Sequence, residues 1–368
     1  MTPFELPSSQ LSRIADEMAS QVREGFSVAP PAAPGAIRHL LTWLNTTTVE
    51  AGEAIAIDSG GTWLRAARVE LPTGRIRAAI HPWAIPKGQP IGVEAFFDEI
   101  ADRIAPLLQA DVPIGWVWSF PGEATPEGDV RHLAWTKEFP VRGDPGLVGE
   151  RLKRALASRG HAAPPVRVLN DTVATLLSSS AIEGHASVGL VVGTGHNLAI
   201  AVDEARLAGR LLARPGRRHI VNLECGNFDP GTLSAFDDAL DAASGQPGWQ
   251  RLEKAVSGHT LGTLYRAAGG EAEARDAGDV VAAAVRRDPI AISLVHRSAD
   301  LVAAAVAGAA RAVGEPVSVV GEGSVFWSDG YPERFLTTLA RLGCPCRLAP
   351  KVAGATTMGA AIAARTAL

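Results

Sequence analysis

The chain has 368 residues, of which 46% are hydrophobic and 20% are charged, and its formal net charge is −4. This length is sufficient for two domains with a sizeable core, and the composition is typical of a globular protein. The sequence has no long basic run, which argues against a nucleic-acid surface, since such a surface is normally a basic patch.

The sequence also bears on the compartment. We find no uninterrupted apolar run of bilayer length, and the first residues lack the pattern of a secretory signal. The three cysteines form no disulfide framework, and Cys344 and Cys346 have no second Cys or His pair with which to bind a metal. We therefore expect a cytoplasmic protein that is not attached to a membrane.

The first elements can be predicted from apolar periodicity. Residues 8–25 predict an amphipathic helix that ends at Gly25, and the proline-rich stretch 28–36 predicts an extended loop. Residues 54–58 and 63–71 predict two strands joined by a glycine-containing turn. A strand, a turn and a second strand differ from a Rossmann or P-loop unit, which requires a helix after the turn.

The remaining elements alternate along the chain. We expect helices near 92–110, within 144–160, and at 172–181, 301–313 and 355–368, and strands at 112–120, 166–170, 188–192 and 317–320. Beyond Gly226 the chain is expected to be mainly helical. A strand–turn–strand unit recurs at residue 188, but the similarity is too weak to establish a repeat.

Two predicted strands end on chemically suggestive residues. Asp171 follows a strand and begins a helix, which is where open α/β sheets bind ligands, although Asn170 and Asp171 are also typical helix caps. The turn 193–195 leaves room for a phosphate to approach the backbone, although glycine turns are common. Together they suggest phosphoryl transfer from a nucleotide to a small polar substrate.

The ordered motifs resemble those of the eukaryotic-type hexokinases and glucokinases, in the actin-like ATPase superfamily. The resemblance runs nearly end to end and is carried by the segments 58–65, 119–121, 135–139, 170–176, 193–197, 222–228, 246–262 and 321–326. It implies an α/β, ribonuclease H-like fold of two domains with a cleft between them. The small domain would comprise residues 52–169, with 354–368 returning to it, and the large domain residues 1–51 and 170–353. The oligomeric state cannot be read from the sequence.

The same resemblance implies roles for individual residues. Asp171 would accept the proton of the sugar hydroxyl, and Lys137 would stabilise charge near the transferred phosphoryl group. Carboxylates and amides suit a polyol, because each hydroxyl both donates and accepts hydrogen bonds. The implied sugar-binding residues are Ser119, Thr136, Lys137, Asn170, Asp171, Asn197, Glu224 and Glu253.

A second set of residues would bind ATP. The implied nucleotide-binding residues are Asp58, Gly60, Gly61, Thr62, Arg65, Gly193, Thr194, Gly195, Gly323 and Ser324, the last two near the adenosine. Mg²⁺ would bridge the phosphates and offset developing charge. No metal ligand is certain, and Asp58 is the candidate for an indirect contact.

Some positions depart from the family pattern. Trp63 replaces an Asn, His196 replaces a small residue, and Cys225 replaces a Trp. We interpret His196 as a packed or exposed turn residue rather than as a phosphate contact. These departures put the nucleotide geometry in more doubt than sugar binding.

The implied activity is ATP-dependent phosphorylation of glucose or a related hexose at its 6-hydroxyl. One alternative is a sugar-binding regulatory protein with weak or no phosphotransfer, which Trp63 and His196 motivate. Another is a kinase for a different sugar or phosphoryl donor. The intact Asp171 and Lys137 argue against the regulatory alternative.

Overall fold

The computed structural model describes residues 4–46, 49–59, 63–84, 89–135, 139–181, 186–212, 214 and 216–366. Contacts divide the chain into two compact units. Unit 1 comprises Met1–His39, Ala186–Gly216 and Asn222–Lys351, and unit 2 comprises Leu40–His185, Arg217–Val221 and Val352–Leu368. Asn170 and Asp171 thus fall in unit 2, whereas the predicted large domain begins at residue 170. The predicted domain boundaries stay a prediction.

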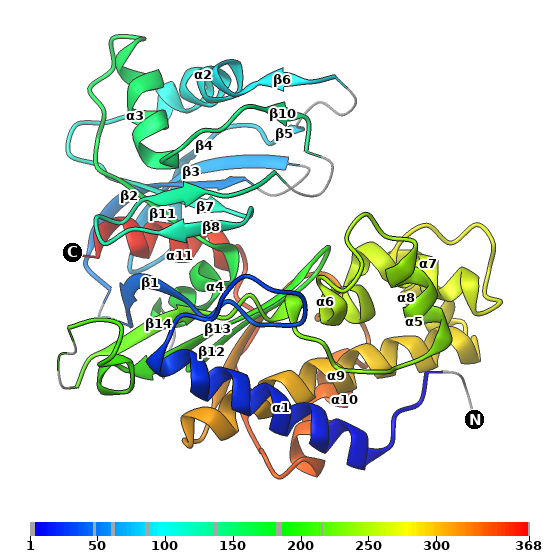
Figure 1. Cartoon of the computed structure of the whole chain (residues 1–368). Coiled ribbons are helices and arrows are strands. Elements are labelled where there is room, and N and C mark those ends of the chain that lie inside the picture. Colours follow the sequence, from blue (N-terminus) through cyan, green and yellow to red (C-terminus); the bar gives the residue numbers. More distant parts are fainter. Residues whose placement is uncertain are drawn as a thin grey trace. The chain divides into compact units, whose positions relative to one another are not determined.

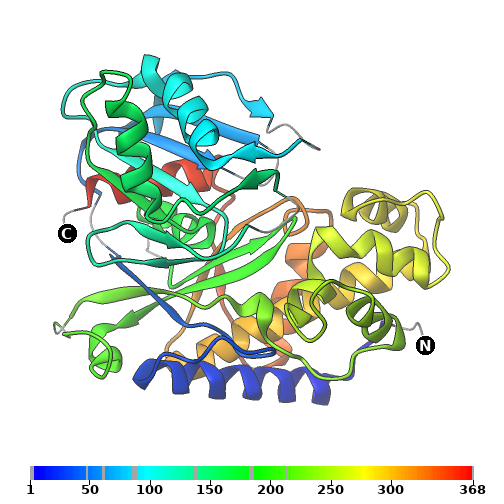
Figure 2. The same cartoon turned by 45° about the horizontal axis from the view of Figure 1, so that its top comes forward.

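A long central helix organises unit 1. Helix α9 (Pro289–Val313) packs against α1 (Ser8–Ser27), α8 (Ala277–Val285) and α10 (Tyr331–Arg341) (Figures 1 and 2). By length and composition α9 could cross a membrane, which the sequence analysis did not recognise, but 83% of its most apolar window is buried inside the protein. Neighbours on several sides explain why this helix is apolar almost all round, as core helices are.

The sheet of unit 1 brings the carboxyl ends of two parallel strands to one edge. Its strands lie in the order β13 (His196–Asp203), β12 (Val188–Val192), β15 (Ser318–Glu322) and β16 (Arg347–Leu348). Because β12 and β15 are parallel, with Val191 opposite Glu322, their carboxyl ends lie side by side. Ligands bind at such an edge in open α/β sheets.

Beyond Gly226 the chain is mainly helical, as predicted. Besides α8, α9 and α10, the helices of unit 1 after β13 are η3 (Glu204–Leu207), η4 (Cys225–Asn227), α5 (Ala235–Ala242), α6 (Arg251–Val256) and α7 (Gly258–Ala267). Helix α6 contacts both η4 and β13, so it lies close to the turn between β12 and β13.

Unit 2 is built on a mixed sheet. The strand order is β11 (Val166–Leu169), β7 (Ile114–Trp118), β2 (Gly52–Ser59), β3 (Trp63–Leu71) and β4 (Arg75–Ala79), and β5 (Trp83–Ala84) also pairs with β3. Strands β11, β7 and β2 are parallel, so their carboxyl ends share one edge. Shorter strands complete the unit: β1 (Leu40–Asn45), β14 (Arg218–Asn222), β8 (Gly122–Ala124), β9 (Val130–His132), β6 (Ile91–Gly92) and β10 (Val141–Arg142).

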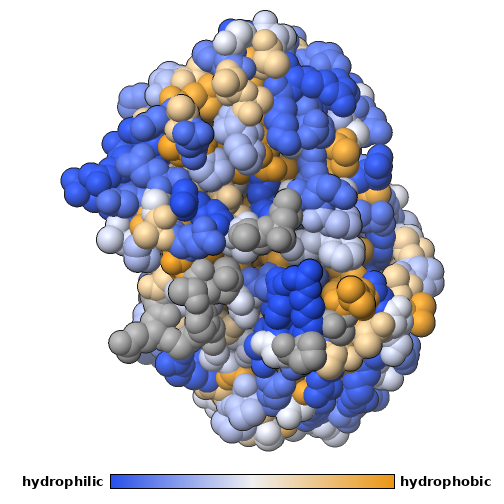
Figure 3. Space-filling model, turned by 90° about the vertical axis from the view of Figure 1, so that its left-hand side faces the viewer, coloured by the Kyte–Doolittle hydropathy of each residue, from blue (hydrophilic) through white to orange (hydrophobic). Residues whose placement is uncertain are grey.

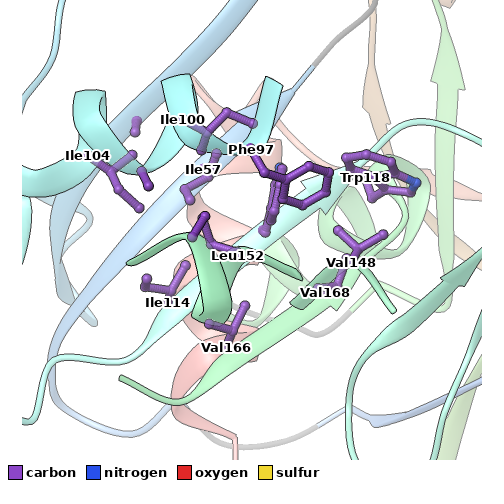
Figure 4. Close-up of a cluster of buried hydrophobic side chains, with 14 of the residues drawn as sticks. Ile57, Phe97, Ile100, Ile104, Ile114, Trp118, Val148, Leu152, Val166 and Val168 are labelled. Atoms are coloured by element: carbon purple, nitrogen blue, oxygen red, sulfur yellow. The ribbon is translucent and has the colours of Figure 1, made fainter. Parts of the chain in front are cut away.

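Helices cover both faces of this sheet (Figure 1). On one face lie α2 (Val93–Ile104), which continues into η1 (Ala105–Leu107), and α3 (Val148–Ala157); on the other lie α4 (Asp171–Ser178), which continues into η2 (Ser179–Ala181), and α11 (Ala355–Arg365). Phe97, Ile100, Trp118 and Leu152 belong to the core between the sheet and the first pair (Figure 4). Each such fully buried apolar side chain contributes about 1.5–3 kcal/mol to folding.

The surface carries apolar residues singly. Figure 3 shows one face on which hydrophilic residues predominate and hydrophobic ones are scattered among them. The large hydrophobic residues that the structure exposes include Val28, Trp63, Ile76, Leu133, Leu212 and Val285. Isolated exposures of this kind are ordinary for a folded protein.

Most elements predicted from the sequence are confirmed, and the differences include the following. Helix α1 passes through Gly25 and ends two residues later, because Gly25 is buried within the helix. Helix α9 begins at Pro289 rather than near residue 301, since Asp288 caps it by accepting a hydrogen bond from the Ala291 backbone. The sequence analysis did not predict α10, nor the strand β1.

Candidate active site

A tight turn at the edge of the unit 1 sheet contains three predicted nucleotide-binding residues. In the turn that joins β12 to β13, the Gly193 N–H donates to the Gly195 carbonyl at 2.9 Å. The Gly193 carbonyl accepts a hydrogen bond of 2.7 Å from the Gly258 N–H, and the Thr194 carbonyl accepts one from the His259 N–H. The turn is therefore held at the N-terminus of α7, because its carbonyls accept hydrogen bonds from the first two N–H groups of that helix.

The segment after β15 meets the same turn. Gly323 has φ 111°, and a Cβ there would lie only 2.2 Å from the Val192 carbonyl oxygen. Only glycine allows this approach, which brings Gly323 and the exposed Ser324 beside Gly193. The structure thus brings together the two predicted nucleotide segments of unit 1. Their role in binding ATP stays a prediction.

An amide–carboxylate network lies next to the turn. The Asn197 side-chain amide donates to Asn222 Oδ1 at 2.7 Å and to Glu224 Oε1 at 3.3 Å. The Asn222 amide donates to the same Glu224 oxygen at 2.7 Å. Asn222 was not among the predicted site residues, although it belongs to the motif 222–228 that the sequence analysis singled out. It fixes two predicted sugar-binding residues at once.

The two predicted sugar-binding glutamates, Glu224 and Glu253, are half-buried and held by the backbone around them. Glu224 has φ 51°, a left-handed conformation that is uncommon for a residue other than glycine and that often marks a functional site. Glu253, on α6, accepts a 2.9 Å hydrogen bond at Oε2 from the His196 N–H. A Cβ at Gly195 would lie 2.7 Å from Glu253 Oε2, so a side chain there would displace this carboxylate.

Two departures from the family pattern are in contact beneath this network. His196 is 3% exposed and Cys225 is fully buried, and His196 Nε2 lies 3.5 Å from Cys225 Sγ. Burial lowers the pKa of His196 to about 4, and burial raises the pKa of the Cys225 thiol. Both side chains are therefore neutral near pH 7. The structure packs His196 into the protein, in keeping with the first of its two interpretations.

In unit 2, two predicted sugar-binding residues, Asn170 and Asp171, lie at the start of α4, where such residues are also typical helix caps. Asn170 is the N-cap of α4, and its Oδ1 accepts a 2.9 Å hydrogen bond from the Thr172 N–H. Asp171 begins the helix, and its Oδ1 accepts from the same N–H at 2.8 Å and from the Thr172 hydroxyl at 3.3 Å. Among the described residues no hydrogen bond engages Asp171 Oδ2, so this oxygen can accept a proton from a substrate.

Asp58 lies near Asp171 at the carboxyl end of β2. The Thr356 hydroxyl, on α11, donates to Asp58 Oδ2 at 2.9 Å, and the exposed Arg65 guanidinium lies 3.9 Å from the same oxygen. Burial raises the pKa of Asp58, and the negative charge of Asp171 raises it further, against the opposing effects of Thr356 and Arg65. A cation near Asp58 would counter both causes of the rise.

Some predicted residues lie elsewhere or outside the described part of the chain. Ser119 directly follows β7 and is half-buried at the same sheet edge as Asp58 and Asn170. Outside the described residues are Gly60, Gly61, Thr62, Thr136 and Lys137. Predicted site residues thus form one group in unit 1 and one in unit 2.

Most of the chain matches known proteins. Residues 1–181 and 187–275 each match a family model described as hexokinase. Hexokinase-3 of Rattus norvegicus is 31% identical over 285 residues, and Hexokinase-2 of Homo sapiens is 33% identical over 282 residues. Each alignment covers 72% of this chain but only 30% of the relative, so the chain spans about a third of the length of these proteins.

A solved structure agrees over nearly the whole chain. It is described as hexokinase from Schistosoma mansoni complexed with glucose, is 26% identical, and superposes with a TM-score of 0.83 over 99% of this chain and 97% of that one. The fold therefore belongs to the α/β class of actin-like ATPases with two domains, as predicted. Within that class, the chain belongs to the hexokinase family.

Proposed function

We propose that the protein transfers the γ-phosphoryl group of ATP to the 6-hydroxyl of a hexose, with glucose as its substrate. The observation that carries the proposal is the network of Asn197, Asn222 and Glu224, with Glu253 close by, next to the turn 193–195. Such amides and carboxylates match the alternating donors and acceptors of a polyol. Family membership and the glucose complex of the Schistosoma mansoni relative also support it.

In this proposal Asp171 is the general base. Its Oδ2 accepts the proton of the 6-hydroxyl, the hydroxyl oxygen forms a bond to the γ-phosphorus, and the bond from that phosphorus to the bridging oxygen breaks, which releases ADP. The Thr172 N–H and hydroxyl hold the other oxygen of Asp171, so the carboxylate is oriented before the substrate binds. Lys137, outside the described residues, would stabilise charge on the phosphoryl group.

The residues that we propose for the hexose come from the predicted sets in each unit. Unit 1 would supply Asn197, Glu224 and Glu253, and unit 2 would supply Ser119, Asn170 and Asp171, together with Thr136 and Lys137. ATP would bind at the glycine segments, with its phosphates at residues 60–62 and 193–195 and its adenosine near Gly323 and Ser324. The backbone packing of Gly193 against Gly258 and Gly323 supports this placement.

The family implies a divalent metal ion, and we propose Mg²⁺. Among the described residues no group of three His, Cys, Asp or Glu side chains could hold an ion, so a cage made only of protein ligands does not fit. A single carboxylate at Asp58 fits the preference of Mg²⁺ for phosphates and waters as its main ligands. When bound, the ion would offset the charge on the phosphates.

The test is ADP release from the purified protein with Mg-ATP, with and without glucose. We expect glucose-dependent release, and we expect Asp171→Asn to lower kcat by about 100-fold or more with little change in glucose affinity, because loss of a general base typically costs this much. A useful control is Thr337→Ala, an exposed hydroxyl that donates only to the Glu333 carbonyl of its own helix. Full activity in Asp171→Asn would exclude Asp171 as the base.

Other outcomes distinguish the alternatives. Saturable glucose binding without ADP release would favour the regulatory protein, which the exposed Trp63, next to residues 60–62 in the chain, motivates. Release with another sugar or another phosphoryl donor, but not with glucose and ATP, would redefine the substrates. We also propose a cytoplasmic, reducing compartment, supported by three free cysteines in the described part of the chain.

A further inference from the structure

The side chains of His196 and Cys225 form a buried contact that the proposed reaction does not use. They come from β13 and η4, 29 residues apart, and their reactive atoms lie 3.5 Å from each other. Both side chains are buried, and the imidazole lies beside the small thiol.

The geometry assigns the protons of this contact. His196 Nδ1 lies 3.0 Å from the Val191 carbonyl oxygen, and a carbonyl can only accept, so Nδ1 carries the hydrogen. In the neutral ring Nε2 is then an acceptor, and the Cys225 S–H donates to it. Burial favours the neutral form of both groups, which agrees with this assignment.

The backbone atoms of the same two residues hold the proposed hexose-binding side chains. The His196 N–H donates to Glu253 Oε2 at 2.9 Å, and the Cys225 N–H donates to Asn197 Oδ1 at 3.2 Å. Cys225 also directly follows Glu224, whose left-handed backbone must be maintained by its surroundings. A shift of either side chain would therefore move carboxylates and an amide of the proposed hexose site.

We propose that His196 and Cys225 are a positioning pair, in which the thiol–imidazole hydrogen bond sets the orientation of Glu224, Glu253 and Asn197 and thereby the affinity for hexose. The inference rests on the proposed function, because it assumes that these three side chains bind the sugar. A cysteine–histidine pair could also suggest a nucleophile, but this thiol is fully buried and its pKa is raised, so it is inert.

The experiment compares matched variants of the full chain. Cys225→Ser keeps a small hydrogen-bond donor, whereas Cys225→Ala differs from it only by the absence of the hydroxyl. His196→Ala and the double variant His196→Ala/Cys225→Ala complete a double-mutant cycle. Cys346→Ala, at a half-buried thiol outside the proposed site, is the control. The KM for glucose, the KM for ATP and kcat are measured for each.

We expect Cys225→Ala and His196→Ala each to raise the KM for glucose by about five-fold or more, as loss of one hydrogen bond of ordinary strength would do. The KM for glucose of the double variant should be no higher than that of the more impaired single variant, because each single variant already removes the shared hydrogen bond. Cys225→Ser should stay within about two-fold of the wild type, and so should the KM for ATP in every variant. If the increases in KM of the two single variants multiply in the double variant, or if Cys225→Ser and Cys225→Ala raise KM equally, the proposed positioning pair would be overturned.

A measurement on the unmodified protein keeps the proposal testable if the alanine variants fold poorly. The ¹⁵N spectrum of the His196 ring at pH 7 should show a neutral imidazole protonated at Nδ1. A ring protonated at Nε2, or a charged ring, would overturn the assignment. If the wild type neither binds nor phosphorylates glucose, the proposed function fails instead, and the ring spectrum still decides whether the hydrogen bond exists.

Discussion

At the scale of single residues, Asn222 shows what a motif alone does not reveal. The sequence places it two residues before Glu224, but its bond to Asn197, 25 residues away, depends on how the folded segments align. We predict that Asn222→Ala weakens glucose binding by about ten-fold, because Glu224 and Asn197 each lose a partner and become free to turn away. Isothermal titration with glucose would measure this.

A control separates orientation from stability. Asn222→Ala removes a buried hydrogen-bonding side chain and should lower the free energy of unfolding as well. Thr338→Ala should lower it too, because it removes a buried hydroxyl that donates to Asp300, between α9 and α10. It should leave the glucose affinity unchanged, since Thr338 contacts no proposed site residue. If both variants weaken glucose binding equally, the effect of Asn222→Ala would reflect general loss of structure.

Burial of His196 also predicts a dependence of stability on pH. Its pKa is about 4 in the folded protein, against about 6.5 when unfolded, so the unfolded state binds more protons between these values. Stability from this residue is therefore complete above pH 6.5 and is lost as the pH falls towards 4. Between pH 7.5 and pH 5 the loss amounts to about 2 kcal/mol. Urea unfolding of the wild type and of His196→Gln at both pH values would measure it.

The comparison with His196→Gln isolates this residue from other titrating groups. His132 and His296 also have lowered pKa values because of burial, and they contribute equally to both proteins. We expect the variant to lose less stability on acidification than the wild type. An identical loss in the two proteins would mean that His196 is protonated in the folded state.

At the scale of elements, close packing of α11 holds the helix that carries Asp171. A Cβ at Gly359 would lie 1.8 Å from the Ala174 carbonyl oxygen of α4, so the two helices approach at backbone distance. We predict that Gly359→Ala lowers the free energy of unfolding by about 1–3 kcal/mol, because α4 or α11 must move. It should also lower kcat, since Asp171 begins α4.

The matched control is Gly245→Ala. Gly245 lies in a bend outside any helix, has no left-handed φ, and nothing lies within 4 Å of a Cβ placed there. This variant should change neither stability nor activity beyond a few tenths of a kcal/mol. Chemical denaturation of both variants would test the pair, and wild-type stability in Gly359→Ala would contradict the packing argument.

Periodicity predicted the long elements because they bury one clear face. Strand β3 agrees with its predicted bounds, and β12 does as well. Helix α10 also has an apolar face, formed by Tyr331, Phe335 and Leu339, so its pattern was present but not used. Strands of two or three residues, such as β6 and β10, have no period to detect and form only when distant segments meet.

At the scale of the whole molecule, the family resemblance contributed what local patterns could not. Each motif taken alone fits a turn, a cap or a surface carboxylate, and the structure shows that Asn170 does cap α4. Only the order of the motifs along the chain connected the residues of the two units. The partners of Glu224 and Glu253 required coordinates, because hydrogen bonds between side chains are set by tertiary packing.

The proposed hexose-binding residues of each unit can be tested one at a time. Glu224→Gln, in unit 1, should weaken glucose binding by about 10–100-fold, because hydrogen bonds to a charged carboxylate are the stronger ones. Asn170→Ser, in unit 2, should weaken it by about five-fold while leaving the free energy of unfolding unchanged, since serine caps a helix as well as asparagine. Titration of both variants with glucose, together with thermal unfolding, would separate the two roles of Asn170. Wild-type glucose affinity in Asn170→Ser would show that Asn170 caps α4 but does not bind the sugar.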